Sequence, residues 1–255
     1  MSSTSTEEND MRTQAPPQQT TGPRYPLMER PVVAVALALV AGLLNAWTFG
    51  QAQTFATVQS GNIVSVGYAL VSGDLARAQA ALISIVAFGL GAFVCAVFLA
   101  FLARRRAFYS AAVLVIEAIL LIALVVASLI WSLPAVWMAF GISIIAGIQG
   151  NAFHREAGML YGNIAVTFVL QNVGGMLGRG ATKRVFDDGE PHVRRAAQYA
   201  VVLIGFAAGG GIGFAADELW TMTSLTLAAT ILLAIALTAS VTRSSIDPGQ
   251  NNPTP

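Results

Sequence analysis

Charged side chains are scarce in this sequence. Asp, Glu, Lys and Arg make up 11% of the 255 residues, whereas soluble domains carry about 25%. So few charges cannot cover the surface of a soluble domain. Hydrophobic residues make up 55% of the chain, and the mean hydropathy is +0.66. We therefore expect an integral membrane protein with the lipid bilayer as its partner.

Three further absences narrow the function. The formal net charge is only +1, so there is no basic excess to bind the phosphates of a nucleic acid. Cys95 is the only cysteine, which excludes an internal disulfide and a cysteine metal site. The sequence also contains no Walker-type phosphate loop, no GxSxG elbow and no HExxH motif. We expect no enzyme, no cofactor and no metal.

Long apolar runs cover most of the chain, each close to the roughly 20 residues that a helix needs to cross a bilayer. The runs are 32–50, 78–103, 108–130, 134–153, 196–216 and 220–241. Two further stretches, 55–72 and 158–178, are long enough to cross but contain polar residues and glycines. The alternatives are eight crossings, or six crossings with two interrupted or re-entrant segments, all of them helical.

Basic residues favour six crossings, because loops on the cytoplasmic side keep Lys and Arg. With the N-terminus inside, a re-entrant 55–72 places the arginine triplet 104–106 inside, whereas a full crossing places it outside. The basic residues of 179–195 and Arg243 then also lie inside, and Arg77 alone lies outside. This predicts that both ends of the chain are cytoplasmic.

The two weak segments occupy matching places in two halves of the chain. AGLLNAW at 41–47 resembles AGIQGNAF at 146–153, with one residue inserted. Three residues of the first half recur in the second at one constant spacing: Arg77, Phe88 and Gly91 match Arg195, Phe206 and Gly209. Each half holds three crossings and one interrupted segment, so the second half is expected to be inverted relative to the first.

The predicted organisation is a disordered tail at 1–30, membrane repeats at 31–131 and 132–242, and a disordered tail at 243–255. Inverted repeats with paired interrupted segments are typical of transporters, whose site lies where the breaks meet. Irregular backbone is tolerated at that depth only beside protein or a wet cavity. The alternative is a decayed repeat whose polar residues join helices by hydrogen bonds of about 0.6 kcal/mol each.

Two motifs resemble the signatures of a known family. They are GLLNAWTF (42–49) with FATVQSGN (55–62), and GIQGNAF (147–153) with Val166-Thr167. Over roughly residues 32–241 the chain is similar to the YoaK-like family of uncharacterised bacterial membrane proteins. Asn45 stands where that family usually has an acidic residue, and Ser60 replaces the Thr of a Thr-Gly-Asn. The resemblance implies a multi-pass fold in the bacterial cytoplasmic membrane and gives no substrate.

Polar residues of the weak segments and of the matching helix ends form the candidate solute site. They are Asn45, Gln59, Ser60, Gly61, Asn62, Gln149, Asn151, Thr167 and Asn172. Amides offer donors and acceptors without net charge, which suits a polar or weakly charged solute, or water. Gly61 and Asn62 are the most specific pair, because the glycine frees the backbone and the amide is presented at mid-membrane. The alternative is that these groups only join helices.

Glu117 is the only acidic residue well inside an apolar run. A charge at that depth costs at least a few kcal/mol, so such residues are functional candidates. Glu117 is a candidate for a proton relay; the alternative is a protonated acid that forms a hydrogen bond to a neighbouring helix.

Gly205, Gly209 and Gly213 recur at every fourth residue. Such a glycine ridge lets helices approach closely. We expect it to pack against another helix, and a second copy of the chain could also use this face.

The leading functional hypothesis is a small-solute secondary transporter or channel-like carrier, with its site between the two interrupted segments. The runner-up is a non-transporting membrane protein, such as a sensor, an assembly factor or a partner subunit, in which polar residues serve helix packing.

Overall fold

The computed structural model describes residues 30–105, 109–153, 155–156, 159–160, 165–185 and 187–241. Apart from Arg30, the predicted disordered tails lie outside these residues. The described helices are α1 (Pro31–Ala52), α2 (Gln59–Ser72), α3 (Leu75–Arg104), α4 (Ser110–Trp131), α5 (Ala135–Ala152), α6 (Val166–Ala181), α7 (His192–Asp217) and α8 (Thr223–Val241). The strands are β1 (Arg155–Glu156) and β2 (Met159–Leu160), which pair antiparallel. The predicted all-helical fold is confirmed, since this short pairing is a connection between helices.

Helix length separates the membrane crossings from the two weak segments. Six of the described helices, α1, α3, α4, α5, α7 and α8, are long and apolar enough to cross a bilayer. α2 and α6 have only 14 and 16 residues, which at 1.5 Å per residue fall short of the ~30 Å of hydrocarbon. The prediction of six crossings and two interrupted segments is confirmed.

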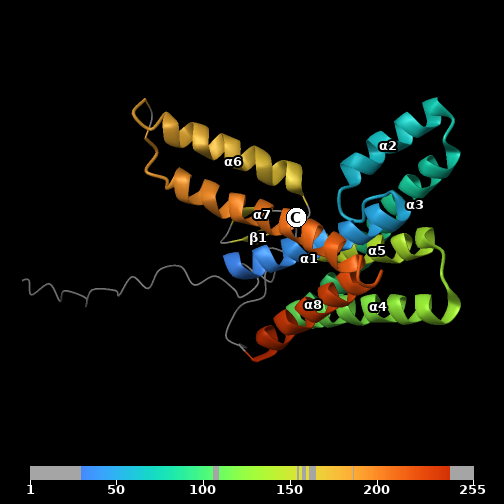
Figure 1. Cartoon of the computed structure of the whole chain (residues 1–255). Helices are drawn as coiled ribbons and strands as arrows, with labels where there is room; N and C mark the ends of the chain where they lie inside the picture. The colour runs from blue at the N-terminus through green and yellow to red at the C-terminus, as the bar shows by residue number, and fades with distance from the viewer. Residues whose placement is uncertain are drawn as a thin grey trace, which may run out of the picture.

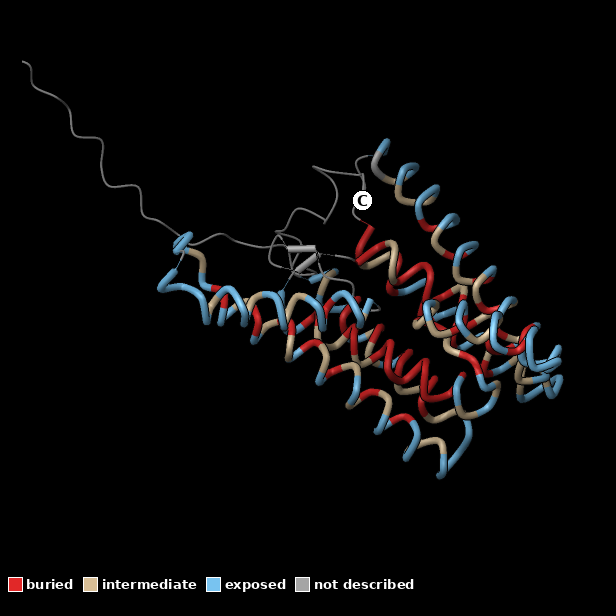
Figure 2. The backbone as a smooth tube through the Cα atoms, turned by 90° about the horizontal axis from the view of Figure 1, so that it is seen from above, coloured by how far each residue is buried: buried red, intermediate tan, exposed pale blue. Residues whose placement is uncertain are grey.

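α1 and α5 lie at the centre of the molecule and pack against each other (Figure 1). α1 also packs on α7, and α5 packs on α3, while α4 and α8 pack on each other. The short helix α2 lies along α3, and α6 lies along α7, so the two short helices occupy opposite sides. Figure 2 shows that buried residues gather in the central helices, while the outer helices are largely exposed.

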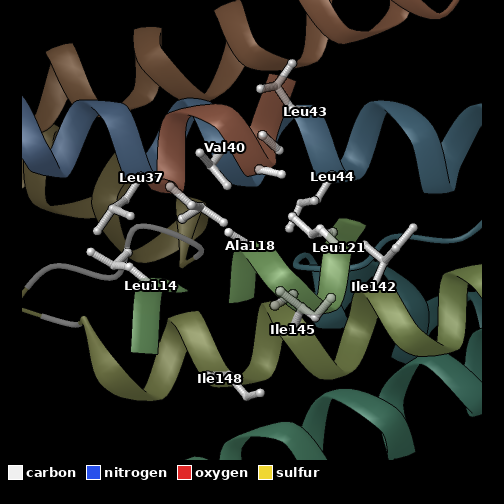
Figure 3. Packing of buried hydrophobic residues seen from close by; sticks show 14 of the residues in the cluster. Leu37, Val40, Leu43, Leu44, Leu114, Ala118, Leu121, Ile142, Ile145 and Ile148 are labelled. Atoms are coloured by element: carbon white, nitrogen blue, oxygen red, sulfur yellow. The ribbon is translucent and has the colours of Figure 1, made fainter. Parts of the chain in front are cut away.

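Leucines and isoleucines of α1, α4 and α5 form the main hydrophobic core. In Figure 3, Leu37 of α1 lies beside Leu114 of α4, and Leu44 lies beside Leu121, with Ile145 of α5 below them. All five side chains are essentially inaccessible to solvent. This core holds the centre of the bundle together and surrounds the acidic residue Glu117, which is also fully buried.

Glycines bring the backbones of the central helices into direct contact with their neighbours. A Cβ atom on Gly42 of α1 would overlap the carbonyl oxygen of Phe206 in α7, and one on Gly209 would overlap that of Leu39 in α1. The α5–α3 contact repeats this arrangement. There a Cβ atom on Gly147 would overlap the carbonyl oxygen of Phe88.

The predicted glycine ridge of α7 faces α1 of the same chain. A Cβ atom on Gly205 would come within 2.9 Å of the Val35 side chain, and one on Gly213 within 2.7 Å of the Ala46 side chain. Packing against another helix is therefore what the ridge does. The suggestion that a second copy of the chain uses this face is corrected, because α1 already fills it.

Charged residues hold the connection between α6 and α7, at the same side of the bundle as the start of α1 and the end of α8 (Figure 1). The Asp188 carboxylate accepts a hydrogen bond from the backbone N–H of Glu190, 3.0 Å away, and lies 2.8 Å from Nε2 of His192. These two contacts lower the pKa of the Asp188 carboxyl. Lys183 pairs with Asp187 at 3.6 Å. Such a charged connection belongs in water.

Candidate functional site

A cavity separates the first turns of the two short helices. α2 and α6 begin near the middle of the molecule and run apart from there (Figure 1). The cavity between them has a volume of about 310 Å³ and is lined by 57–60, Phe88 and 165–168. It thus brings together three of the candidate residues, Gln59, Ser60 and Thr167, although they come from opposite halves of the chain.

Side chains of α1 hold the irregular segment that leads into α2. α1 ends at Ala52, and the next residue, Gln53, has a left-handed backbone with a φ of 53°. Asn45 then accepts a hydrogen bond from the Thr57 backbone N–H at 3.1 Å and donates one to the Thr57 hydroxyl. The Thr48 hydroxyl accepts a hydrogen bond from the backbone N–H of Ala56 at 3.1 Å. These bonds satisfy backbone groups that would otherwise be unpaired at this depth.

Asn62 is the centre of this hydrogen-bond network and is only 1% exposed. It accepts hydrogen bonds from the Thr54 hydroxyl and the Phe55 backbone N–H, both at 3.0 Å. Its amide nitrogen lies 2.6 Å from the Phe55 carbonyl, 2.9 Å from Gln59 Oε1 and 3.1 Å from Ser84 Oγ. Because these partners occupy both ends of the amide, Asn62 fixes the break in the chain.

Gly61 serves the same turn. A Cβ atom at this position would approach the Phe55 ring to 3.3 Å. Glycine thus leaves room for the Phe55 ring beside the start of α2, and this ring also stacks on Phe49 at a centroid distance of 4.9 Å.

The network extends from α2 through α3 to α5. Gln59 lines the cavity and donates a hydrogen bond to the Ala56 carbonyl at 2.7 Å. Ser84 of α3 donates one to the Phe55 carbonyl at 2.8 Å and lies 2.8 Å from the Ser143 hydroxyl of α5. Sequence reasoning missed both serines. Each is a lone polar residue inside an apolar run, and that signal could have identified them.

The candidate residues of the second half are more dispersed. Thr167 lines the cavity, and so does Thr57 of the first half. Asn172 lies farther along α6, partly exposed, and donates a hydrogen bond to the Phe168 carbonyl of its own helix at 2.9 Å. Gln149 is fully buried and donates to the Leu37 carbonyl of α1 at 3.0 Å. Asn151 forms a side-chain hydrogen bond with Cys95 of α3.

Glu117 lies away from the cavity lining, inside the core between α4, α5 and α8. Neither of its carboxyl oxygens has a hydrogen-bond partner among the described residues. The hydrogen bond to a neighbouring helix, which was the alternative to a proton relay, is therefore not found among the described residues. The described residues also contain no group of three His, Cys, Asp or Glu side chains that could hold a metal ion.

Comparison with known protein families shows to which family the chain belongs. No curated protein and no solved structure gives a significant match. The model of one family, described as "Protein of unknown function (DUF1275)", matches residues 33–238. This range includes all eight described helices apart from the ends of α1 and α8. The prediction of an uncharacterised family is thereby confirmed, whereas the YoaK-like name is not tested. The chain belongs to the DUF1275 family.

Proposed function

We propose that this protein is a secondary transporter or channel-like carrier for a small polar solute, which binds between the first turns of α2 and α6. The observation that carries the proposal is the cavity of about 310 Å³ lined by both turns. This volume is at the small end of the roughly 300–1,000 Å³ of ligand pockets. A solute of a few heavy atoms with its hydration water fits this space.

The helix pairings support an inverted repeat around this cavity. Exchanging α1–α4 for α5–α8 converts the α1–α7 contact into the α5–α3 contact, and the α2–α3 contact into the α6–α7 contact. Gly42 and Gly147, which the repeat aligns, each meet a phenylalanine carbonyl of the partner helix. Two halves of this kind can exchange conformations, which is how inverted-repeat carriers open to alternate sides.

The lining favours solutes without positive charge. None of the described residues that line the cavity is charged; the polar ones are Thr57, Gln59, Ser60 and Thr167. The N-terminal ends of two helices carry partial positive charge. A neutral or anionic solute is therefore expected to enter more readily than a cation.

Basic residues support a location in the bacterial cytoplasmic membrane with both chain ends inside. The start of α1, the end of α8 and the α6–α7 connection share one side of the bundle. Arg30 lies at this start, and Lys183, Arg184, Arg194 and Arg195 lie at this connection. Basic residues are retained on the cytoplasmic side.

One observation supports the second candidate function, a non-transporting membrane protein. Asn45 and Asn62 use their amides to hold the protein's own backbone. If every polar group at the break were used in this way, the seam would serve packing alone. Ser60 and Thr167 distinguish the two functions, because both are exposed on the cavity surface.

Solute flux tests the proposal. Purified protein in liposomes is mixed with glycerol, urea, nitrate or choline, and volume change is followed by light scattering. We expect entry of the neutral or anionic probes, and a loss of at least about tenfold when Ser60→Phe or Thr167→Phe fills the cavity. Ser72→Phe and Thr182→Phe are the matched controls, because these exposed residues lie at the far ends of the same helices. Absence of flux for every probe in folded protein would favour the runner-up.

A further inference from the structure

The carboxyl group of Glu117 is enclosed by apolar helices. α4 packs on α8 and α5, and in both of these helices no residue carries an acidic, basic, histidine, cysteine or tyrosine side chain. α1, on the other side of the core, has none either. Cys95 of α3 is a described titratable group that is close enough to interact electrostatically with Glu117. The arginines of α3, Arg77 and Arg104, lie at the two ends of that helix.

This core has buried acceptors without a donor, and among the described residues one buried donor of the core, Trp47 Nε1 of α1, is also without a partner. Both oxygens of Glu117 and Oε1 of Gln149 are fully buried and have no hydrogen-bond partner among the described residues. Gln149 binds the Leu37 carbonyl, Leu37 lies beside Leu114, and Leu114 lies one turn before Glu117 (Figure 3). The three open oxygens thus lie on α4 and α5, two helices that pack on each other.

A proton is the ligand that this set of atoms accommodates. Hard metal cations take six or more oxygen ligands, and three open oxygens fall short of that number. A proton needs a single carboxyl oxygen, removes the charge and supplies the missing donor. An ionised, unpaired carboxylate in the same place would be strongly unfavourable.

We propose that Glu117 is a proton-binding site: the protonated carboxyl is compatible with the closed packing of α4 on α5, and loss of the proton to water opens this packing. The reaction is the transfer of one proton between the carboxyl and water, with no other bond made or broken. Its role as the coupling proton of transport rests on the carrier proposed above. Proton binding and opening do not depend on that function.

Cys95 is a built-in reporter of this opening. It is the only cysteine of the chain and is 2% exposed, so a thiol reagent reaches it only when the helices around it separate. Alkylation by N-ethylmaleimide is measured in membranes containing the full chain, from about pH 6 to about pH 9, in wild type and Glu117→Gln. The thiolate fraction alone raises both rates about tenfold per pH unit. We expect the ratio of the wild-type rate to the Glu117→Gln rate to rise at least about fivefold over this range.

Whether this ratio of rates rises above one or falls below it distinguishes opening of the helices from electrostatics alone. A negative Glu117 opposes formation of a negative thiolate nearby, so electrostatics alone would make the wild type the slower protein at high pH. A ratio that stays at or below one would overturn the proposal. Val202→Cys in a Cys95→Ala background is the matched control, because Val202 is 2% exposed in a separate cluster with Ala34 and Tyr199. Its rate should be the same with Glu117 or Gln at position 117.

A second measurement applies if Glu117→Gln does not fold. In the wild type, hydrogen exchange of the α4 backbone amides should rise with pH more steeply than that of amides 200–212 in the middle of α7, because α4 carries the fully buried Glu117, whereas the α7 acid, Asp217, lies at the end of that helix. Equal pH dependence in the two helices would overturn the proposal. Neither measurement uses a solute, so failure here leaves the flux experiment standing, and failure of flux leaves the proton site standing.

Discussion

At the scale of single residues, the polar groups near the break divide into those that hold backbone and those that face the cavity. Asn62 belongs to the first group and Ser60 to the second, although only one residue separates them in α2. A helix turns by about 100° per residue, so neighbouring polar residues face different surroundings. A polar side chain in a membrane segment is therefore not by itself evidence of a solute contact.

Replacement of Asn62 should destabilise the protein. Asn62→Leu keeps the approximate volume but removes hydrogen bonds to Thr54, Phe55, Gln59 and Ser84. At about 0.6 kcal/mol for each bond in a membrane protein, the expected loss is about 3 kcal/mol in the free energy of unfolding. Thermal unfolding in detergent measures it.

Asn172→Leu is the control for this change. Asn172 has one hydrogen bond in the described structure, to a carbonyl of its own helix, and its side chain is partly exposed. Its loss should cost less than about 0.6 kcal/mol. Equal destabilisation by both substitutions would show that the network around Asn62 does not hold the break.

The sequence allowed only part of the site to be predicted. Gln59, Ser60 and Thr167 line one cavity, and a polar residue at an interrupted segment is expected either at such a cavity or in hydrogen bonds to the protein. Phe88 and Phe168 also line it, and nothing in their apolar neighbourhood distinguishes them from core residues. The direction of each amide depends on where the helix begins, and a sequence pattern does not fix that to within one residue.

At the scale of helices, the two central helices α1 and α5 each contact a neighbouring helix directly through the backbone. The contacts of Gly42 and Gly209 join α1 to α7, and those of Gly91 and Gly147 join α3 to α5. Close approach through small residues is how helices associate in a bilayer, where no hydrophobic effect drives them together. The regular spacing of glycines predicted this use from sequence, but the identity of the partner helix required the structure.

Adding one methyl group at these contacts should separate the helices. Gly209→Ala and Gly147→Ala each place a Cβ atom against a backbone carbonyl that cannot move aside. We expect each to lower the free energy of unfolding by about 1–3 kcal/mol. Thermal unfolding of the purified proteins provides the measurement.

Gly211→Ala is the control within α7. A Cβ atom there meets nothing within 4 Å. Alanine is the better helix former by about 1 kcal/mol, so stability should be unchanged or slightly higher. If Gly211→Ala and Gly209→Ala behaved alike, backbone contact at Gly209 would not be the cause.

At the scale of the whole molecule, charge and length together decide the path of the chain. Lengths of 14 and 16 residues leave α2 and α6 too short to cross, and the distribution of basic residues gave the same result from sequence. The arginine triplet 104–106 was decisive in that prediction, although residue 106 lies outside the described residues. The sequence sufficed here because a bilayer constrains both the length of every crossing segment and the side on which basic residues lie.

This path predicts which connections face which side of the membrane. A reporter that is active only outside the cell is fused after Arg105, after Ser132 or after Val241. We expect activity after Ser132 alone, because six crossings place the α4–α5 connection opposite the two chain ends. Full crossing by 55–72 would instead give activity after Arg105, and would also separate α2 from its place at the cavity. That single result would remove both the re-entrant path and the site that depends on it.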